Sequence, residues 1–130
     1  MKVKCKEKKI NNHSSVYINL TLNKEYIVLA IEFYNNEISI FSNHIGDYIL
    51  YRIEDDDGLV MPLPSKLFII TSNELPRGWV SYRDNDECYS LISSKWAKPG
   101  FWEEFYNDES NALAVFESVK KQIYADEGCN

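Results

Sequence analysis

The first two thirds of the chain alternate apolar and polar residues with the two-residue period of β-strands. Residues 16–22 predict a half-buried strand, because four apolar side chains share one face: Val16, Ile18, Leu20 and Leu22. Residues 24–33 form a longer apolar run, rich in β-branched and aromatic residues, and predict one central strand. Shorter strands are expected over residues 37–41, 47–53 and 66–71, the last of them buried.

Turn residues separate these strands. Residues 55–58 end in an Asp-Gly pair, which is typical of a tight reversal. Pro62 and Pro64 have no backbone N–H to donate, so their segment should lie at a sheet edge or in a loop. Residues 79–83 and 87–92 are expected to pair as a hairpin.

The period changes near the C-terminus, where apolar residues recur at spacings of three and four: Ala112, Val115, Phe116, Val119 and Ile123. This stripe predicts an amphipathic helix over residues 108–124, with Asp108 as its N-cap. Residues 99–102 should form a connector or a short helical turn before it. Because the stripe must cover a sheet, the predicted fold class is α+β. We expect a curved antiparallel sheet or a partly closed barrel with one C-terminal helix packed on it.

The chain has 130 residues, which indicates a single domain. Residues 1–15 are rich in Lys and Asn, and we expect them to form a mobile arm, with room for a short strand at its start. The α+β domain is then expected to span residues 16–130.

Charge is distributed unevenly along the chain. The formal net charge is −6, yet residues 1–9 hold five Lys and one Glu. Residues 10–130 therefore hold 9 basic and 19 acidic residues, a net charge of −10. An acidic body repels nucleic acid and attracts basic proteins, so we expect a basic protein partner and no nucleic acid.

Composition favours a cytoplasmic protein that does not enter a membrane. The longest apolar stretch is far shorter than the ~20 residues that span a bilayer, and the N-terminus does not resemble a signal peptide. The three cysteines are odd in number and form no CxxC pair, which fits a reducing compartment. Nothing in the sequence predicts an oligomeric state.

Catalytic and metal-binding patterns are weak. The chain contains no GxSxG, P-loop or GxGxxG motif. His44 lies near Asp47, but a loop His beside a loop Asp is an ordinary surface arrangement. An EF-hand loop that starts at Asp55 fails, because its sixth and twelfth positions are Val60 and Lys66. We therefore expect no enzymatic activity, no cofactor and no metal.

Acidic residues beside aromatic ones are the strongest candidates for a binding surface. Rings provide desolvated anchors, and carboxylates orient a basic partner and speed its association. The candidate partner-binding residues are Asp55, Asp56, Asp57, Trp79, Tyr82, Asp84, Asp86 and Glu87. A further cluster joins Glu103 and Glu104 to Phe101 and Trp102, and we expect these two rings to pack the helix onto the sheet.

One segment resembles a known class of proteins. Residues 96–105 read Trp-Ala-Lys-Pro-Gly-Phe-Trp-Glu-Glu-Phe and lead into Asp108 and a helix that starts near Asn111. This stretch resembles part of some small bacterial immunity proteins that accompany polymorphic toxins, including those of contact-dependent growth inhibition. Residues 22–29 and 66–70 are similar to strands of an SH3-like barrel found in such proteins.

The resemblance implies a cytoplasmic antitoxin that binds the toxin domain of a cognate effector and blocks it by stoichiometric occlusion. Many such toxins are nucleases with basic clefts, which an acidic inhibitor would fit. The alternative is a small-ligand or peptide-binding module, and a pocket of ~300 Å³ or more lined by Trp and Tyr would favour it. A third hypothesis, an enzyme built around Cys88, His44 or paired acids, would need a deep cleft.

Overall fold

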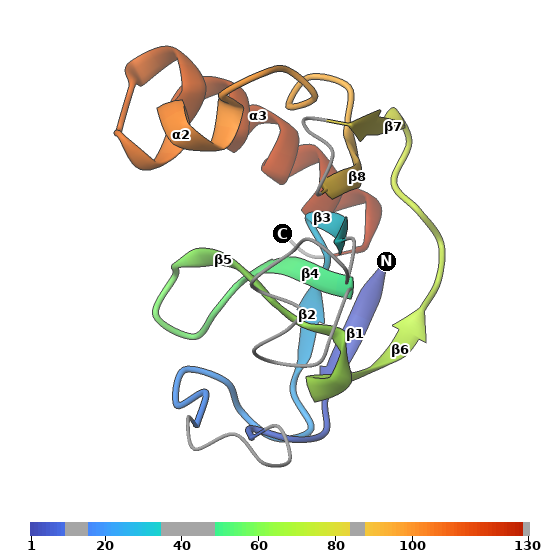
Figure 1. The fold of residues 1–130 in the computed structure, drawn as a ribbon. Helices are drawn as coiled ribbons and strands as arrows, with labels where there is room; N and C mark the ends of the chain where they lie inside the picture. The colour runs from blue at the N-terminus through green and yellow to red at the C-terminus, as the bar shows by residue number, and fades with distance from the viewer. Residues whose placement is uncertain (10–15, 35–48, 84–87, 129–130) are drawn as a thin grey trace.

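The computed structural model describes residues 1–9, 16–34, 49–83 and 88–128. Figure 1 shows two antiparallel sheets with the C-terminal helices at one end of the molecule. One group of buried side chains joins the two sheets, and a second group joins the larger sheet to the helices. The α+β class is therefore confirmed, although there are two sheets rather than one. Neither sheet closes on itself within the described residues, so a barrel is not confirmed.

The smaller sheet has three strands in the order β2-β1-β6. Its middle strand is β1 (Lys2–Cys5), which lies between β2 (Glu25–Ile27) and β6 (Phe68–Ser72). Val3 and Cys5 are fully buried. The start of the chain is thus part of the core rather than of an arm, because Val3 and Cys5 alternate with Lys2 and Lys4 and give the strand one apolar face.

The larger sheet has five antiparallel strands in the order β5-β4-β3-β8-β7. They are β3 (Ala30–Tyr34), β4 (Ile49–Glu54), β5 (Val60–Pro64), β7 (Trp79–Arg83) and β8 (Cys88–Ser93). The proline-containing strand β5 lies at an edge, and β7 pairs with β8, as predicted. The strand predicted over residues 37–41 lies outside the described residues.

The apolar run at residues 24–33 does not form one strand. It divides into β2 and β3, which belong to different sheets. Between them Val28 and Leu29 are fully buried, and their backbone N–H groups donate to the carbonyls of Met1 and Arg52. The sequence shows no break in the apolar run, because the residues that connect the two strands are buried in the centre of the molecule as well.

One other strand prediction was wrong, and a second was right only in part. Residues 16–22 contain only an isolated bridge at Val16, and of their four aligned apolar side chains only Leu20 is buried. The segment at residues 66–71 becomes a 3₁₀ turn (Ser65–Leu67) followed by β6. Ile69 and Ile70 of β6 are about half exposed, so this strand is an edge and not a buried strand.

Two helices cover one face of the larger sheet. The short helix α2 (Phe101–Tyr106) precedes the long helix α3 (Ser110–Asp126). Four residues of the predicted stripe are buried, whereas Val115 is 37% exposed. Asp108 is not the N-cap: it has a left-handed backbone (φ 58°), and Glu109 occupies the cap position without a side-chain hydrogen bond. No helix in the described part of the chain has the length and apolar character needed to cross a bilayer.

Candidate ligand cavity between helix α2 and the sheet

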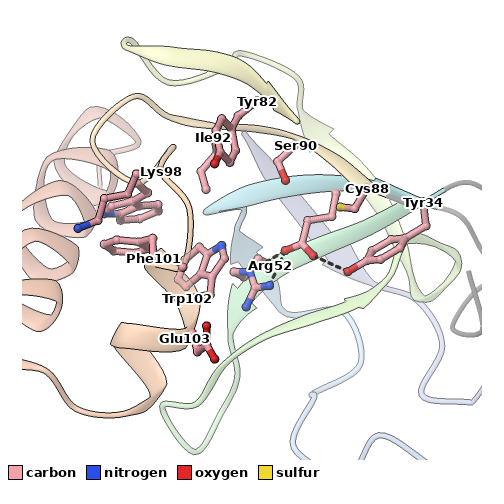
Figure 2. A pocket seen from close by; sticks show the side chains of 13 residues that line it. Tyr34, Arg52, Tyr82, Cys88, Ser90, Ile92, Lys98, Phe101, Trp102 and Glu103 are labelled. Carbon is pink, nitrogen blue, oxygen red and sulfur yellow. Dashed lines mark hydrogen bonds and ion pairs between the residues drawn. The ribbon is translucent and has the colours of Figure 1, made fainter. Parts of the chain in front are cut away.

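A cavity of about 320 Å³ opens between α2 and the helix-facing side of the larger sheet. We call it the α2 cavity. Figure 2 shows Tyr82, Ser90 and Ile92 on one side of it and Phe101 and Trp102 on the other, with Arg52 beside Trp102 and Tyr34 on the side of Cys88. The remaining lining residues include Glu32, Trp96, Lys98, Gly100 and Glu103. The cavity is therefore a mixture of aromatic walls and charged groups.

A buried ion pair forms part of the cavity wall. Glu32 and Arg52 project from neighbouring strands β3 and β4, and their side chains are only 5% and 7% exposed. Nε and Nη2 of Arg52 both lie 2.6 Å from Oε2 of Glu32. Tyr34 donates to the other carboxylate oxygen at 3.2 Å. Both oxygens of Glu32 are thus engaged, as a buried carboxylate requires.

The guanidinium of Arg52 also ties α2 to the sheet. Its central carbon lies 4.1 Å from the ring centroid of Trp102, a cation–π contact. Nη1 donates to the Tyr106 hydroxyl at 2.7 Å, and that hydroxyl donates to the carbonyl of Val60 on the edge strand β5. Arg52 therefore occupies one face of Trp102 and positions the helix over the cavity.

The aromatic wall is a packed cluster around Trp96. Its ring is stacked on Phe116 at 5.0 Å and on Phe101 at 6.0 Å, and the edge of Trp102 lies 5.5 Å away. The predicted packing role of Phe101 and Trp102 is confirmed by their place in this cluster. The indole N–H of Trp96 is buried and has no acceptor among the described residues, so it is a hydrogen-bond donor that this part of the chain leaves unpaired.

Two titratable side chains at one end of the cavity, Cys88 and Tyr34, both have raised pKa values. Burial, followed by the nearby charge of Glu32, raises the pKa of the Cys88 thiol. The same two causes raise the pKa of the Tyr34 hydroxyl far above its usual range. A thiol with a raised pKa is a poor nucleophile, so this arrangement favours binding over covalent chemistry.

The three acids at residues 55–57 have different environments. Asp55 is buried, and its Oδ1 accepts hydrogen bonds from the backbone N–H groups of Asp57 and Leu59, both at 2.9 Å. Asp56 accepts from Lys24 and Thr21 at 2.6 Å and from Tyr26 at 2.8 Å. Asp57 is exposed. The predicted turn is confirmed, and two of its three carboxylates hold the fold together.

We expect Asp55→Ala to lower the free energy of unfolding by about 1–3 kcal/mol, because two backbone N–H groups of the turn lose their acceptor. The matched change Asp57→Ala should alter it by less than about 0.5 kcal/mol. Urea unfolding of the two variants measures the difference. Equal stabilities would show that the Asp55 hydrogen bonds contribute nothing to the turn.

Asp56 should make stability depend on pH in the acidic range. Hydrogen bonds from Lys24, then from Thr21, lower the pKa of Asp56 from 3.8 to about 2. A carboxyl with a lowered folded-state pKa stabilises the fold above its unfolded pKa, and this stabilisation is lost as pH falls from about 4 to about 2. Asp56→Asn should therefore be less stable than the wild type at pH 6, and the gap should close near pH 2. Urea midpoints measured between pH 2 and 6 test this, and a gap that is independent of pH would contradict it.

The other predicted site residues do not form one surface with the turn. Trp79 and Tyr82 lie on β7, at the opposite edge of the sheet from the β4–β5 turn. They also belong to opposite faces of the sheet, because Trp79 packs against the core between the sheets and Tyr82 against the core under the helices. Asp84, Asp86 and Glu87 lie outside the described residues, as do His44 and Asp47.

The sequence did not identify Glu32 and Arg52 as site residues. A signal was present: each is a single charge inside an apolar strand, at Ile31-Glu32-Phe33 and Tyr51-Arg52-Ile53. Opposite charges on neighbouring buried strands indicate a pair, since a lone buried charge is too costly. The sequence alone does not show that β3 and β4 are neighbours in the sheet, and it is this strand order that brings Glu32 and Arg52 together.

Among the described residues, no three His, Cys, Asp or Glu side chains gather into a set that could hold a metal ion. Comparison of the chain with protein-family models, with curated proteins and with solved structures found no match.

Proposed function

We propose that this chain works as a binding protein and that the α2 cavity is the site for a small ligand or for a short segment of a peptide. The observation that carries the proposal is the combination of a 320 Å³ space, a wall with Trp96 and Trp102, and an ion pair fixed in that wall. Ligand sites are concave, largely aromatic and supplied with a few positioned polar groups. The volume is at the lower end of the range for such sites.

The hydrogen-bonding groups of the cavity favour a ligand that accepts hydrogen bonds. Both oxygens of Glu32 are used by Arg52 and Tyr34, while three of the five N–H groups of Arg52 are accounted for. Arg52 also covers one face of Trp102, so a cationic ligand would meet a fixed positive charge there. A carbonyl or amide group flanked by apolar surface fits these walls best.

Three tryptophans make the proposal testable by NMR of their indole N–H groups. Titration with N-acetyl amino-acid amides should shift the Trp96 and Trp102 signals in a saturable way, and leave Trp79 in place because it does not line this cavity. Ser90→Leu, which fills the cavity from β8, should weaken binding at least about tenfold, or 1.4 kcal/mol. Ser118→Leu on the exposed side of α3 is the matched control. If no amide shifts either signal, or if Ser90→Leu binds as the wild type does, the α2 cavity is not a ligand site.

A second candidate is the toxin-neutralising function, carried out in the cytoplasm by occlusion of a basic toxin domain. The net charge of −6 and the exposed carboxylate of Asp57 support it. Co-expression with a toxin domain encoded beside this gene should rescue growth, and Asp57→Lys should slow association of the purified pair. Growth that is not rescued would exclude the neighbouring product as the partner.

A further inference from the structure

Within the described residues the two sheets have four edge strands, β2 and β6 in the smaller sheet and β5 and β7 in the larger one. The unpaired backbone groups of an edge pair readily with another chain, and proteins usually protect an edge with a charged residue or with proline. β2 contains Glu25, β7 contains Arg83, and β5 contains Pro62 and Pro64. β6 reads Phe-Ile-Ile-Thr-Ser and contains neither kind of residue. It is therefore the least protected of these four edges.

The free side of β6 also exposes apolar side chains. Figure 1 shows this strand beside β1, on the side away from β2. Residues 69–72 form no backbone hydrogen bond with a described segment other than β1. Ile69 is 46% exposed and lies opposite Lys4, on the outer face of the sheet. Ile70 is 52% exposed although it lies opposite the fully buried Val3, on the core side. A strand added here would pair with the free backbone groups and cover apolar surface on both faces.

The charges that flank β6 are placed symmetrically about Ile70. Lys66 precedes Ile70 by four residues, Glu74 follows it by four, and both side chains are exposed. When two β6 strands pair antiparallel with Ile70 at the centre, Lys66 of each copy lies opposite Glu74 of the other, because a two-fold interface makes every contact twice. Opposite charges across a strand pair are favourable and like charges unfavourable. This edge is thus complementary in charge to a second copy of itself.

We propose that two copies of this chain associate through β6, in the antiparallel register centred on Ile70, so that two three-stranded sheets become one sheet of six strands. Ile70 then contacts its counterpart, and Ile69 lies opposite Thr71. The lysines of β1 do not oppose this pairing: the two β1 strands are three strand spacings apart, about 14 Å, which exceeds the Debye length of about 8 Å at physiological salt. β6 does not line the α2 cavity, so the proposal is independent of the function proposed above.

Sedimentation equilibrium of the full chain over a series of concentrations tests the proposal. An interface formed by one short edge strand is small, so we expect a dimer with a Kd between about 10 µM and about 1 mM. In ¹⁵N NMR spectra over the same series, the amide signals of Ile69, Ile70 and Thr71 should shift with concentration, whereas those of the edge strand β5 should stay in place. A chain that remains monomeric up to about 1 mM overturns the proposal.

A charge placed at the symmetry axis tests whether β6 is the interface. Ile70→Lys puts two like charges against each other there and should weaken the dimer at least about tenfold. Val80→Lys makes a comparable change at a 39% exposed position of the edge strand β7 and should leave the Kd unchanged. Far-UV circular dichroism shows whether each variant is folded. If folded Ile70→Lys dimerises as the wild type does, two copies do not meet at β6.

Charge reversal tests the register without changing β6 itself. Lys66→Glu and Glu74→Lys each create two pairs of like charges and should weaken self-association by about threefold or more. An equimolar mixture of these two variants should recover the wild-type affinity, because both pairs across the mixed interface are again of opposite charge. Both positions are exposed and lie outside the strand, so the variants should fold as the wild type does. A mixture that associates no better than the separate variants overturns the proposed pairing.

Discussion

Replacing Arg52 with Met is expected to lower the free energy of unfolding by about 3–5 kcal/mol, because it leaves the Glu32 carboxylate buried without its cation. The Glu32 side chain is only 5% exposed, so water is a poor replacement for the lost partner. The same change removes the guanidinium from Trp102 and from the Tyr106 hydroxyl, which loosens α2 from the sheet. Urea unfolding followed by far-UV circular dichroism measures the loss.

Two controls isolate the buried charge as the cause. The double variant Glu32→Leu with Arg52→Met should be clearly more stable than Arg52→Met alone, since apolar pairs often replace buried ion pairs at little cost. Lys98→Met breaks an exposed ion pair with Glu104 and should change stability by about 0–1 kcal/mol. If Arg52→Met costs as little as Lys98→Met, the Glu32–Arg52 pair is not an important part of the fold.

Phe116→Ala should be similarly destabilising, by about 3–5 kcal/mol. The Phe116 ring is 1% exposed, stacks on Trp96 at 5.0 Å and lies 4.3 Å from Phe105. Its removal leaves a void between α3, α2 and the sheet that rigid rings cannot fill. Domains of this kind are stable by only about 5–15 kcal/mol, so the loss should be visible as a large fall in the urea midpoint.

Val115→Ala is the matched control for Phe116→Ala. It is the preceding residue of the same helix, but its side chain is 37% exposed, and Ala favours helix. We expect a change of less than about 0.5 kcal/mol. A Phe116→Ala variant no less stable than Val115→Ala would mean that the aromatic cluster contributes little to holding the helices.

The sequence predicts those parts of the fold that local chemistry decides. The helix stripe was identified because helical periodicity is a local pattern. The segment of β5 was limited to a sheet edge or a loop because proline cannot donate to a ladder. Residues 24–33 were predicted as one strand because the part in the small sheet and the part in the large sheet are equally apolar, so no change of composition marks the boundary between them. Only long-range pairing, with β1 on one side and β4 on the other, shows where the strand divides.

The N-terminal strand shows a second reason for failure. Lys2, Val3, Lys4 and Cys5 alternate as a strand does, and the prediction left room for a short strand here, but the density of lysines led it to place that strand in a mobile arm. In the structure Lys2 and Lys4 are half-buried and opposite Ile27 and Glu25 of β2. Their long aliphatic stems cover the sheet while their ammonium groups reach water, so charge did not exclude them from the fold.

The candidate site was less predictable than the fold. Tyr82 was identified and lines the α2 cavity, and Trp79 was identified but does not line it; both were assigned to one acidic docking surface. Clustering along the sequence placed them together, whereas alternation along β7 sends them to opposite faces of the sheet. Arg52 was overlooked because the acidic composition directed attention to carboxylates.

The position of β1 has a consequence for biosynthesis. Its two partners, β2 and β6, are separated from it by very different lengths of chain, and Cys5 pairs with Phe68. As the polypeptide emerges from the ribosome, β1 can form a two-stranded ribbon with β2 early, but the small sheet cannot be completed until β6 has been translated. Contacts of such large sequence separation slow folding. The nascent chain should therefore expose one side of β1 during much of its synthesis, which is the interval when a chaperone would recognise it.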